Sequence, residues 1–106
     1  MPKYMLQGSY TSEGARGLLK DGGSSRRAAV EQAVKSVGGT LEVFYFTFGA
    51  DDFVIIADLP DNEAAAATAL RAGSTGTASV RTTVLLTTDQ ADAVTRRVVE
   101  YRPPGA

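Results

Sequence analysis

A glycine- and serine-rich segment that runs into two arginines, Gly22–Arg27, is the part of the sequence best suited to bind a ligand. Glycines let backbone N–H groups approach a bound group, and the start of a helix favours negative charge. Arg26 and Arg27 can each donate paired hydrogen bonds to a carboxylate or a phosphate, and Ser24 adds a hydroxyl. The segment lacks the Gly-Lys-Ser/Thr sequence of a nucleotide-binding P-loop. The alternative is a flexible turn with a serine cap and two solvated arginines.

Two adjacent carboxylates, Asp51 and Asp52, could serve acid–base chemistry if one of them had a raised pKa. Neighbours in a strand point to opposite faces, so only an irregular turn would bring both to one site. The alternative is a solvent-exposed hairpin turn. Asp58 could add a third oxygen ligand, but no calcium-loop spacing is present, and we expect no metal site. Asp52 and Tyr45 are candidate polar contacts for a ligand, although aromatic residues on strands more often belong to the core.

The composition excludes several classes of function. The chain has no Cys and no His, which removes disulfides, thiolate nucleophiles, imidazole bases and the usual zinc site, and we expect no cofactor. Eleven Lys and Arg against 12 Asp and Glu give a net charge of −1, so neither a nucleic acid nor a membrane surface is an expected partner. No signal peptide or membrane-spanning run is visible, and we expect a cytoplasmic protein.

The first half of the chain predicts a strand, two helices and a second strand. These elements are a strand over Lys3–Tyr10, a weak helix over Thr11–Lys20, a helix that Ser24 or Ser25 caps and that Gly38-Gly39 ends, and a strand over Thr40–Phe48. In the second strand, Leu41, Val43 and Tyr45 should share one face and Phe44 and Phe46 the other.

The second half predicts a strand, a helix, a strand and a last helix. These are a strand over Phe53–Leu59, a helix over Ala64–Ala72 opened by Pro60–Glu63, a strand over Thr77–Thr87, and a helix with a Thr87/Gln90 capping box and Ala91, Val94, Val98 and Tyr101 on one face. The 106 residues therefore predict a single α+β domain, residues 1–106, with the ferredoxin-like order βαββαβ, a four-stranded antiparallel sheet and an extra C-terminal helix.

The central strands predict a homodimer. The helices of this topology lie mainly on one face of the sheet, and a sheet whose other face is wet alternates apolar and polar residues. The strands over 40–48 and 53–59 are apolar on both faces, and each large apolar side chain left in water forgoes roughly 1.5–3 kcal/mol. We therefore expect two copies to stack their sheet faces about a two-fold axis, with a higher assembly left open.

Several short pieces occur in a characteristic order along the chain. They are Pro2-Lys3-Tyr4, Ser9-Tyr10-Thr11, Gly22–Arg27, Phe46–Gly49 followed by Asp52, Asp58–Asp61 and Tyr101–Gly105. Together they resemble the GYD domain proteins of bacteria over essentially the whole chain. The resemblance implies a dimeric α/β barrel and little about activity, because the family is known mainly as a domain of unknown function. Asp51 stands where the family motif has its tyrosine, so that phenol is missing here.

Three hypotheses of function follow. In the first, the homodimer binds a small organic ligand, with an anionic group as the natural partner of its arginines, in a cleft beside the sheet. Ser24, Arg26 and Arg27 orient the ligand, and Tyr45 and Asp52 add polar contacts. In the second, the protein is a cofactor-independent enzyme, monooxygenase- or isomerase-like, as other dimeric α/β barrels are, although fold analogy is weak support. In the third, it is a structural or regulatory assembly module. A cavity lined by apolar side chains and converging polar groups would favour the first two.

Overall fold

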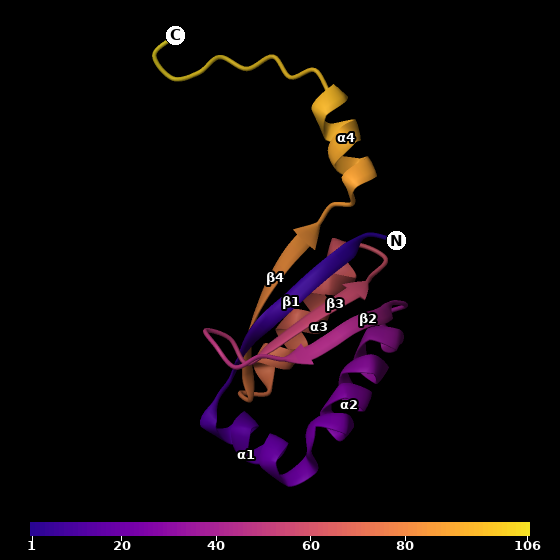
Figure 1. Ribbon diagram of the computed structural model, residues 1–106, viewed down its shortest axis with the longest axis vertical. Coiled ribbons are helices and arrows are strands. Elements are labelled where there is room, and N and C mark those ends of the chain that lie inside the picture. The colour runs from indigo at the N-terminus through magenta and orange to yellow at the C-terminus, as the bar shows by residue number, and fades with distance from the viewer.

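The computed structural model describes residues 1–106 and contains four strands and four helices (Figure 1). In chain order they are β1 (Lys3–Tyr10), α1 (Ser12–Asp21), α2 (Gly23–Ser36), β2 (Thr40–Phe46), β3 (Phe53–Asp58), α3 (Asn62–Ser74), β4 (Ala78–Leu85) and α4 (Thr88–Arg96). Of the two strands that follow a helix, β2 is two residues and β4 three residues shorter than predicted.

The strands form one antiparallel sheet in the order β2-β3-β1-β4. Helices α2 and α3 lie on one face of the sheet, α2 packing on β2 and α3 on β4. The other face, which is turned toward the viewer in Figure 1, carries no helix. This arrangement is a ferredoxin-like fold, and the predicted fold class is confirmed.

A small core fills the space between the sheet and its helices. Alternate residues of β1 and β3 point into it, including Tyr4, Leu6 and Ile55, all of which are buried. Val34 of α2 and Ala65 of α3 pack on them from the helix-covered side of the sheet. The only polar group of Tyr4, its hydroxyl, donates a hydrogen bond of 2.6 Å to Asn62 at the start of α3. Burial of this tyrosine is therefore tolerated, because its hydroxyl keeps a partner.

Side chains at the N-termini of three helices satisfy free backbone N–H groups. Thr11 caps α1, Asp61 caps α3, and Thr87 with Gln90 forms the predicted capping box of α4. The prediction that a serine caps α2 is wrong. The residue at that position is Gly22, whose φ of 83° lets the chain turn directly from α1 into α2, so Ser24 and Ser25 lie inside the helix.

A β-bulge in β2 corrects the predicted faces of this strand. Leu41 is opposite Ala57 and Val43 is opposite Ile56, so Glu42 has no partner in the ladder. The extra residue reverses the alternation, and Leu41 therefore shares the helix-covered face with Phe44 and Phe46 rather than with Val43 and Tyr45. The rings of Phe44 and Phe46 pack edge to face there, with centroids 5.0 Å apart.

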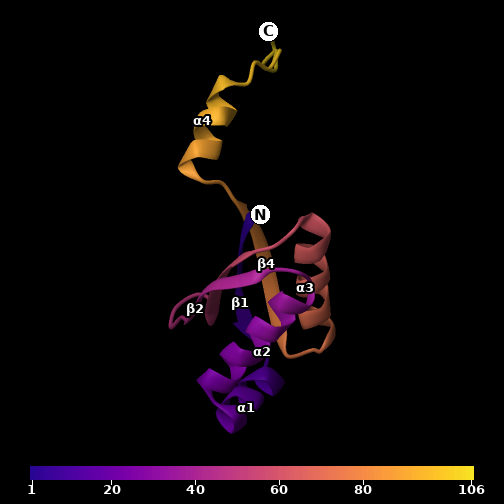
Figure 2. The ribbon, with the colours of Figure 1, turned by 90° about the vertical axis from the view of Figure 1, so that its right-hand side faces the viewer.

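The end of the chain extends away from the rest of the protein (Figures 1 and 2). Every residue of α4 is exposed, and the helix makes no substantial contact with another element. It ends at Arg96, where Arg97 adopts an extended conformation, so Val98 and Tyr101 lie beyond the helix on which they were predicted. The β-branched pair Val98-Val99, which disfavours helix, accounts for this early end.

Two glycines of α1 give a matched test of the packing between this helix and the turn before β4. A Cβ atom on Gly14 would lie 2.0 Å from the carbonyl oxygen of Thr77, whereas a Cβ atom on Gly17 would meet nothing within 4 Å. We expect Gly14→Ala to lower the free energy of unfolding by about 1–3 kcal/mol through overpacking. Gly17→Ala should raise it by up to about 1 kcal/mol through helix propensity. Urea unfolding measures both, and equal effects of the two changes would contradict this packing.

Candidate functional site

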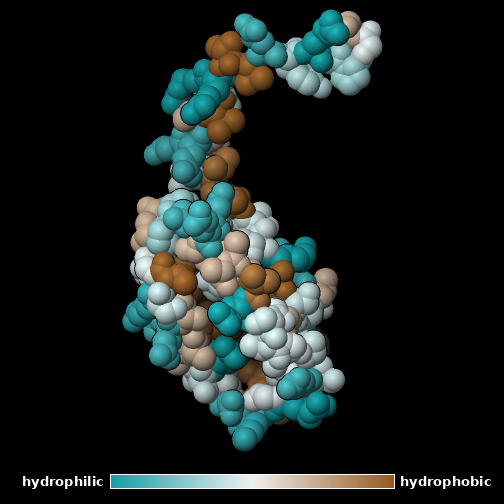
Figure 3. Space-filling view, turned by 180° about the vertical axis from the view of Figure 1, so that it is seen from behind, coloured by the Kyte–Doolittle hydropathy of each residue, from teal (hydrophilic) through white to brown (hydrophobic).

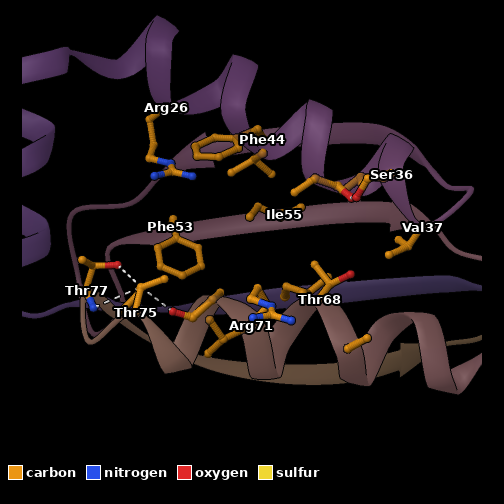
Figure 4. Close-up of a pocket in the computed structure, with 18 of the residues that line it drawn as sticks. Arg26, Ser36, Val37, Phe44, Phe53, Ile55, Thr68, Arg71, Thr75 and Thr77 are labelled. Carbon is orange, nitrogen blue, oxygen red and sulfur yellow. Dashed lines mark hydrogen bonds between the residues drawn. The ribbon is translucent and has the colours of Figure 1, made fainter.

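A groove of about 680 Å³ lies between α2 and α3, with the sheet as its floor (Figure 4). Its volume is within the range of small-molecule binding sites. Most of its lining residues are apolar, and the floor includes Leu6, Phe53, Ile55 and Val80. The groove lies beside the sheet, on its helix-covered face.

The groove exists because the two helices lie over opposite edges of the sheet and do not contact each other. Helix α2 packs on β2 and α3 packs on β4, which leaves a space between the helices over the two middle strands. Several of the helix residues that line this space are short: Ala33 on α2, and Ala67, Thr68 and Ala72 on α3. Such side chains do not reach across to the other helix, so the space stays open.

Two arginines, one from each helix, point into the groove. Arg26 extends from the first part of α2 and Arg71 from the last part of α3, on opposite sides of Phe53 (Figure 4). Neither guanidinium group has a carboxylate within salt-bridge distance, because the ion pairs of the chain involve only Lys3, Arg27 and Arg81. No aspartate or glutamate lines the groove. The groove is therefore apolar in its floor and positive on both walls.

Hydroxyl groups gather at the end of the groove near Arg26. Tyr10 stacks at a tilt on Phe53, with ring centroids 5.3 Å apart, and lines the groove beside Thr77. The hydroxyls of Thr75 and Thr77 are 2.6 Å apart (Figure 4). Burial raises the pKa of Tyr10 above its usual 10.0, the positive charge of Arg26 opposes this rise, and Asp52 adds to it. Tyr10 is therefore a neutral hydrogen-bond donor at physiological pH.

Of the predicted site residues on α2, one lies at the groove. Arg26 lines it, but Arg27 points elsewhere and pairs with Glu31 at 3.9 Å, one helical turn further on. Ser24 is exposed and makes no side-chain hydrogen bond to the helix start. Adjacent residues of a helix are about 100° apart around its axis, so Arg26 and Arg27 do not face the same space.

The other two predicted site residues lie outside the groove. Tyr45 is on the open face of the sheet, opposite Val54. Asp52 ties the loop between β2 and β3 to the end of β1: its carboxylate accepts a hydrogen bond of 2.9 Å from the backbone N–H of Tyr10, and its own N–H donates to the carbonyl of Gly8 at 2.7 Å. Asp51 turns the other way and pairs with Arg81. The two aspartates therefore do not form a carboxylate pair.

The open face of the sheet has an apolar half and a polar half. An apolar patch covers β2, β3 and part of β1, and it consists of Met5, Val43, Tyr45, Val54 and Ile56. Gln7 and the exposed residues of β4 on the same face are largely polar. This face is less uniformly apolar than the sequence predicted, because Gln7 and β4 place polar residues on it and the bulge turns Leu41 to the helix-covered side.

A group of three charged residues borders the apolar patch. The Lys3 ammonium lies 2.6 Å from the Glu42 carboxylate and 2.9 Å from that of Asp58. Hydrogen bonds to Glu42 and then to Asp58 raise the pKa of Lys3 above its usual 10.5. The raised pKa means that this contribution to stability is complete below pH 10.5 and is lost as the pH rises through the pKa of the folded state. Glu42, which the bulge leaves without a partner in the ladder, therefore forms an ion pair with Lys3 on β1.

Sequence reasoning did not identify Arg71 as a site residue, and it considered Tyr10 only as one of four tyrosines that could supply a phenol to a pocket. Arg71 lies in the last turn of a helix. The helix dipole favours a cation at this position even without a ligand. A signal for it is nevertheless present: Arg71 lies seven residues after Ala64 and three after Thr68, on the stripe of small residues that faces the sheet. A single arginine on such a stripe points toward the interior of the fold.

The fold and the groove define a small ferredoxin-like α+β domain with one concave, positively charged site. The family model of the GYD domain matches residues 4–95, and the chain belongs to this family. No curated protein and no solved structure shows a significant match to the chain. No helix has the length and apolar character needed to cross a membrane, and no three acidic residues gather where they could hold a metal ion.

The electrostatic contact between Arg26 and Tyr10 can be tested by titration. Arg26 lowers the pKa of Tyr10, so Arg26→Gln should raise that pKa further above 10.0. The absorbance of tyrosinate, taken as the difference between each protein and its Tyr10→Phe counterpart, isolates this group from the other three tyrosines. Arg27→Gln serves as the control and should leave the titration unchanged. A Tyr10 pKa that is the same with and without the Arg26 guanidinium would contradict the placement of Arg26 at this end of the groove.

Proposed function

We propose that this GYD domain protein binds a small organic anion in the groove between α2 and α3. The observation that carries the proposal is the pair of unpaired arginines, Arg26 and Arg71, on the walls of an apolar groove without a single carboxylate. An arginine that faces an apolar surface without a counter-ion gains most from an anionic partner, which it can bind through two parallel hydrogen bonds.

The ligand that suits this groove has an apolar body and an acidic group. The floor of Leu6, Phe53, Ile55 and Val80 accommodates an aromatic ring or a short aliphatic chain, and the volume of about 680 Å³ accepts a molecule of metabolite size. The carboxylate or phosphate of such a ligand would lie between the arginines. The neutral phenol of Tyr10 would donate a further hydrogen bond at one end.

We further propose that the protein is a homodimer whose subunits meet through the open face of the sheet. The apolar patch of Met5, Val43, Tyr45, Val54 and Ile56 has no cover within the chain. A net charge of −1 gives two copies little electrostatic reason to repel each other. The ligand groove lies on the opposite side of the sheet, so this dimer leaves it open.

Binding can be tested with an acid and its uncharged amide, 4-phenylbutyrate and 4-phenylbutanamide, by isothermal titration calorimetry. We expect the acid to bind at least about 10-fold more tightly, because a hydrogen bond to a charged group is worth about 1.5–3 kcal/mol. Arg26→Gln and Arg71→Gln should each weaken binding of the acid by about 10-fold and leave binding of the amide nearly unchanged. Arg27→Gln, the control outside the groove, should bind the acid as the unchanged protein does.

The location of the site has a separate test in its volume. Ala67→Leu adds three carbon atoms to a groove-lining position that is exposed to solvent, so the fold should tolerate it while the ligand loses space. We expect this change to weaken both the acid and the amide. If neither the arginine changes nor Ala67→Leu affects binding of 4-phenylbutyrate, the ligand occupies another site and the proposal is wrong.

The dimer can be tested by adding a charge on either side of the protein. Tyr45 on the open face and Leu70 on the outer side of α3 are 67% and 76% exposed, so glutamate at either position costs the isolated subunit little. We expect Tyr45→Glu to raise the dimer dissociation constant at least about 10-fold, because it would bury a carboxylate in the interface. Leu70→Glu should leave it unchanged. Analytical ultracentrifugation measures both, and a monomer at high micromolar concentration of the unchanged protein would refute the dimer.

A further inference from the structure

The chain exposes more surface than a compact protein of its size. Its accessible surface is 7475 Å², whereas a compact monomer of 11.1 kDa is expected to expose about 5,700 Å². Its radius of gyration is 16.8 Å, against about 13 Å for a compact domain of this length. The excess of about 1,800 Å² is roughly twice what one partner hides in a typical stable interface.

The C-terminal arm, defined as residues 86–101, is exposed at every position. The arm makes no substantial contact with its own subunit, and its large apolar side chains are solvated: Val94 is 58% exposed, Val98 93% and Tyr101 73%. A continuous run of hydrophobic side chains is visible along the arm in Figure 3. The arm is nevertheless well formed, because the capping box of Thr87 and Gln90 fixes the start of α4. It is a structured element without a packing partner.

The position of the arm indicates what covers it. Helix α4 leans to the side of the sheet opposite α3, which is the side of the open face (Figure 2). A body seated on the open face would therefore meet the arm as well. A second copy of this chain brings its own open face and its own arm, so one two-fold arrangement would cover all four apolar surfaces at once.

Area and charge agree with a second copy as the occupant. The open face alone offers only five apolar residues, Met5, Val43, Tyr45, Val54 and Ile56, over about half of the sheet. The arm adds Leu86, Val94, Val98, Val99 and Tyr101 to the surface that association can hide. Its three acidic residues stand against two arginines, and a net charge of −1 is too small to favour an acidic or a basic partner.

We infer that the C-terminal arm of each subunit packs across the second subunit of the homodimer, continuing the interface of the open face. This inference rests on the proposed dimer and adds an exchanged element to it. Residues Val94 and Val98 face the partner, and the acidic residues of α4, Asp89 and Asp92, face solvent. The arm, rather than the sheet alone, then determines the stability of the dimer.

Two neighbouring residues of α4 provide a matched pair of variants in the full chain. Val94 and Ala93 are both apolar and about 100° apart around the helix axis. We expect Val94→Glu to raise the dimer dissociation constant at least about 10-fold and Ala93→Glu to change it less than about 2-fold, as measured by analytical ultracentrifugation. Neither residue touches the body of its own subunit, so the thermal unfolding of the monomer and binding of 4-phenylbutyrate in the groove should be unchanged.

A spin label gives a second readout that does not depend on the effect of a charge. The chain has no cysteine, so Val98→Cys provides a unique attachment point for a nitroxide. Its electron paramagnetic resonance spectrum should show an immobilised label at concentrations where the protein is a dimer and a mobile label after dilution to the monomer. The control label at Asp92→Cys, on the solvent side of α4, should remain mobile in both.

The other outcomes separate this inference from the proposals on which it builds. A dimer that Tyr45→Glu weakens and Val94→Glu does not would retain the sheet interface and overturn the role of the arm. A label at Val98→Cys that is immobilised at every concentration would overturn it in favour of packing on the same subunit. A full chain that stays monomeric with a mobile label would overturn both the dimer and the arm, while binding in the groove is judged separately.

Discussion

Short side chains on α2 and α3 keep these two helices from meeting over the sheet, and the rest of the site depends on this separation. Ala33 on one helix faces Ala67 and Ala72 on the other across the groove. Leucines at these positions would fill the space between the helices. With alanine the space remains, and the charged side chains that reach into it, Arg26 and Arg71, are both cationic. Incomplete packing between the helices, which costs stability, therefore creates the concave surface to which we assign ligand binding.

The sheet separates two surfaces of different character. On one side Tyr4, Leu6 and Ile55 belong to a core that continues into the groove. On the other side Val43, Val54 and Ile56 form a patch bordered by the Lys3, Glu42 and Asp58 charges. Because the two sides do not overlap, variants can test the proposed ligand binding and the proposed association of subunits separately. The loop held by Asp52 connects them, since Asp52 bonds to Tyr10 at the groove and Asp51 to Arg81 on the open side.

The sequence predicted the order of the elements because strong local signals mark them. Thr11, Asp61 and the Thr87/Gln90 box start their helices in the structure as they do in the pattern of residue types. The faces of β2 could not be predicted, because a bulge leaves no residue-type signature in Thr40–Phe46 and depends on how this strand pairs with β3. Arg26 was recognised from its place after a glycine pair. Arg71 was missed, because only the folded arrangement brings the end of α3 opposite the start of α2.

The bulge at Glu42 also sets which parts of the chain can change in length. Removal of one residue from β2 would restore simple alternation and turn either Leu41 or both Phe44 and Phe46 away from their cover. The loop between Phe46 and Phe53 faces no such restriction except at Asp51 and Asp52, and Gly49 has nothing near it. Relatives of this protein should therefore keep the residue count between Thr40 and Phe46 and accept insertions around Gly49. A sequence alignment that shifts β2 by one residue would exchange the buried and exposed positions of this whole edge strand.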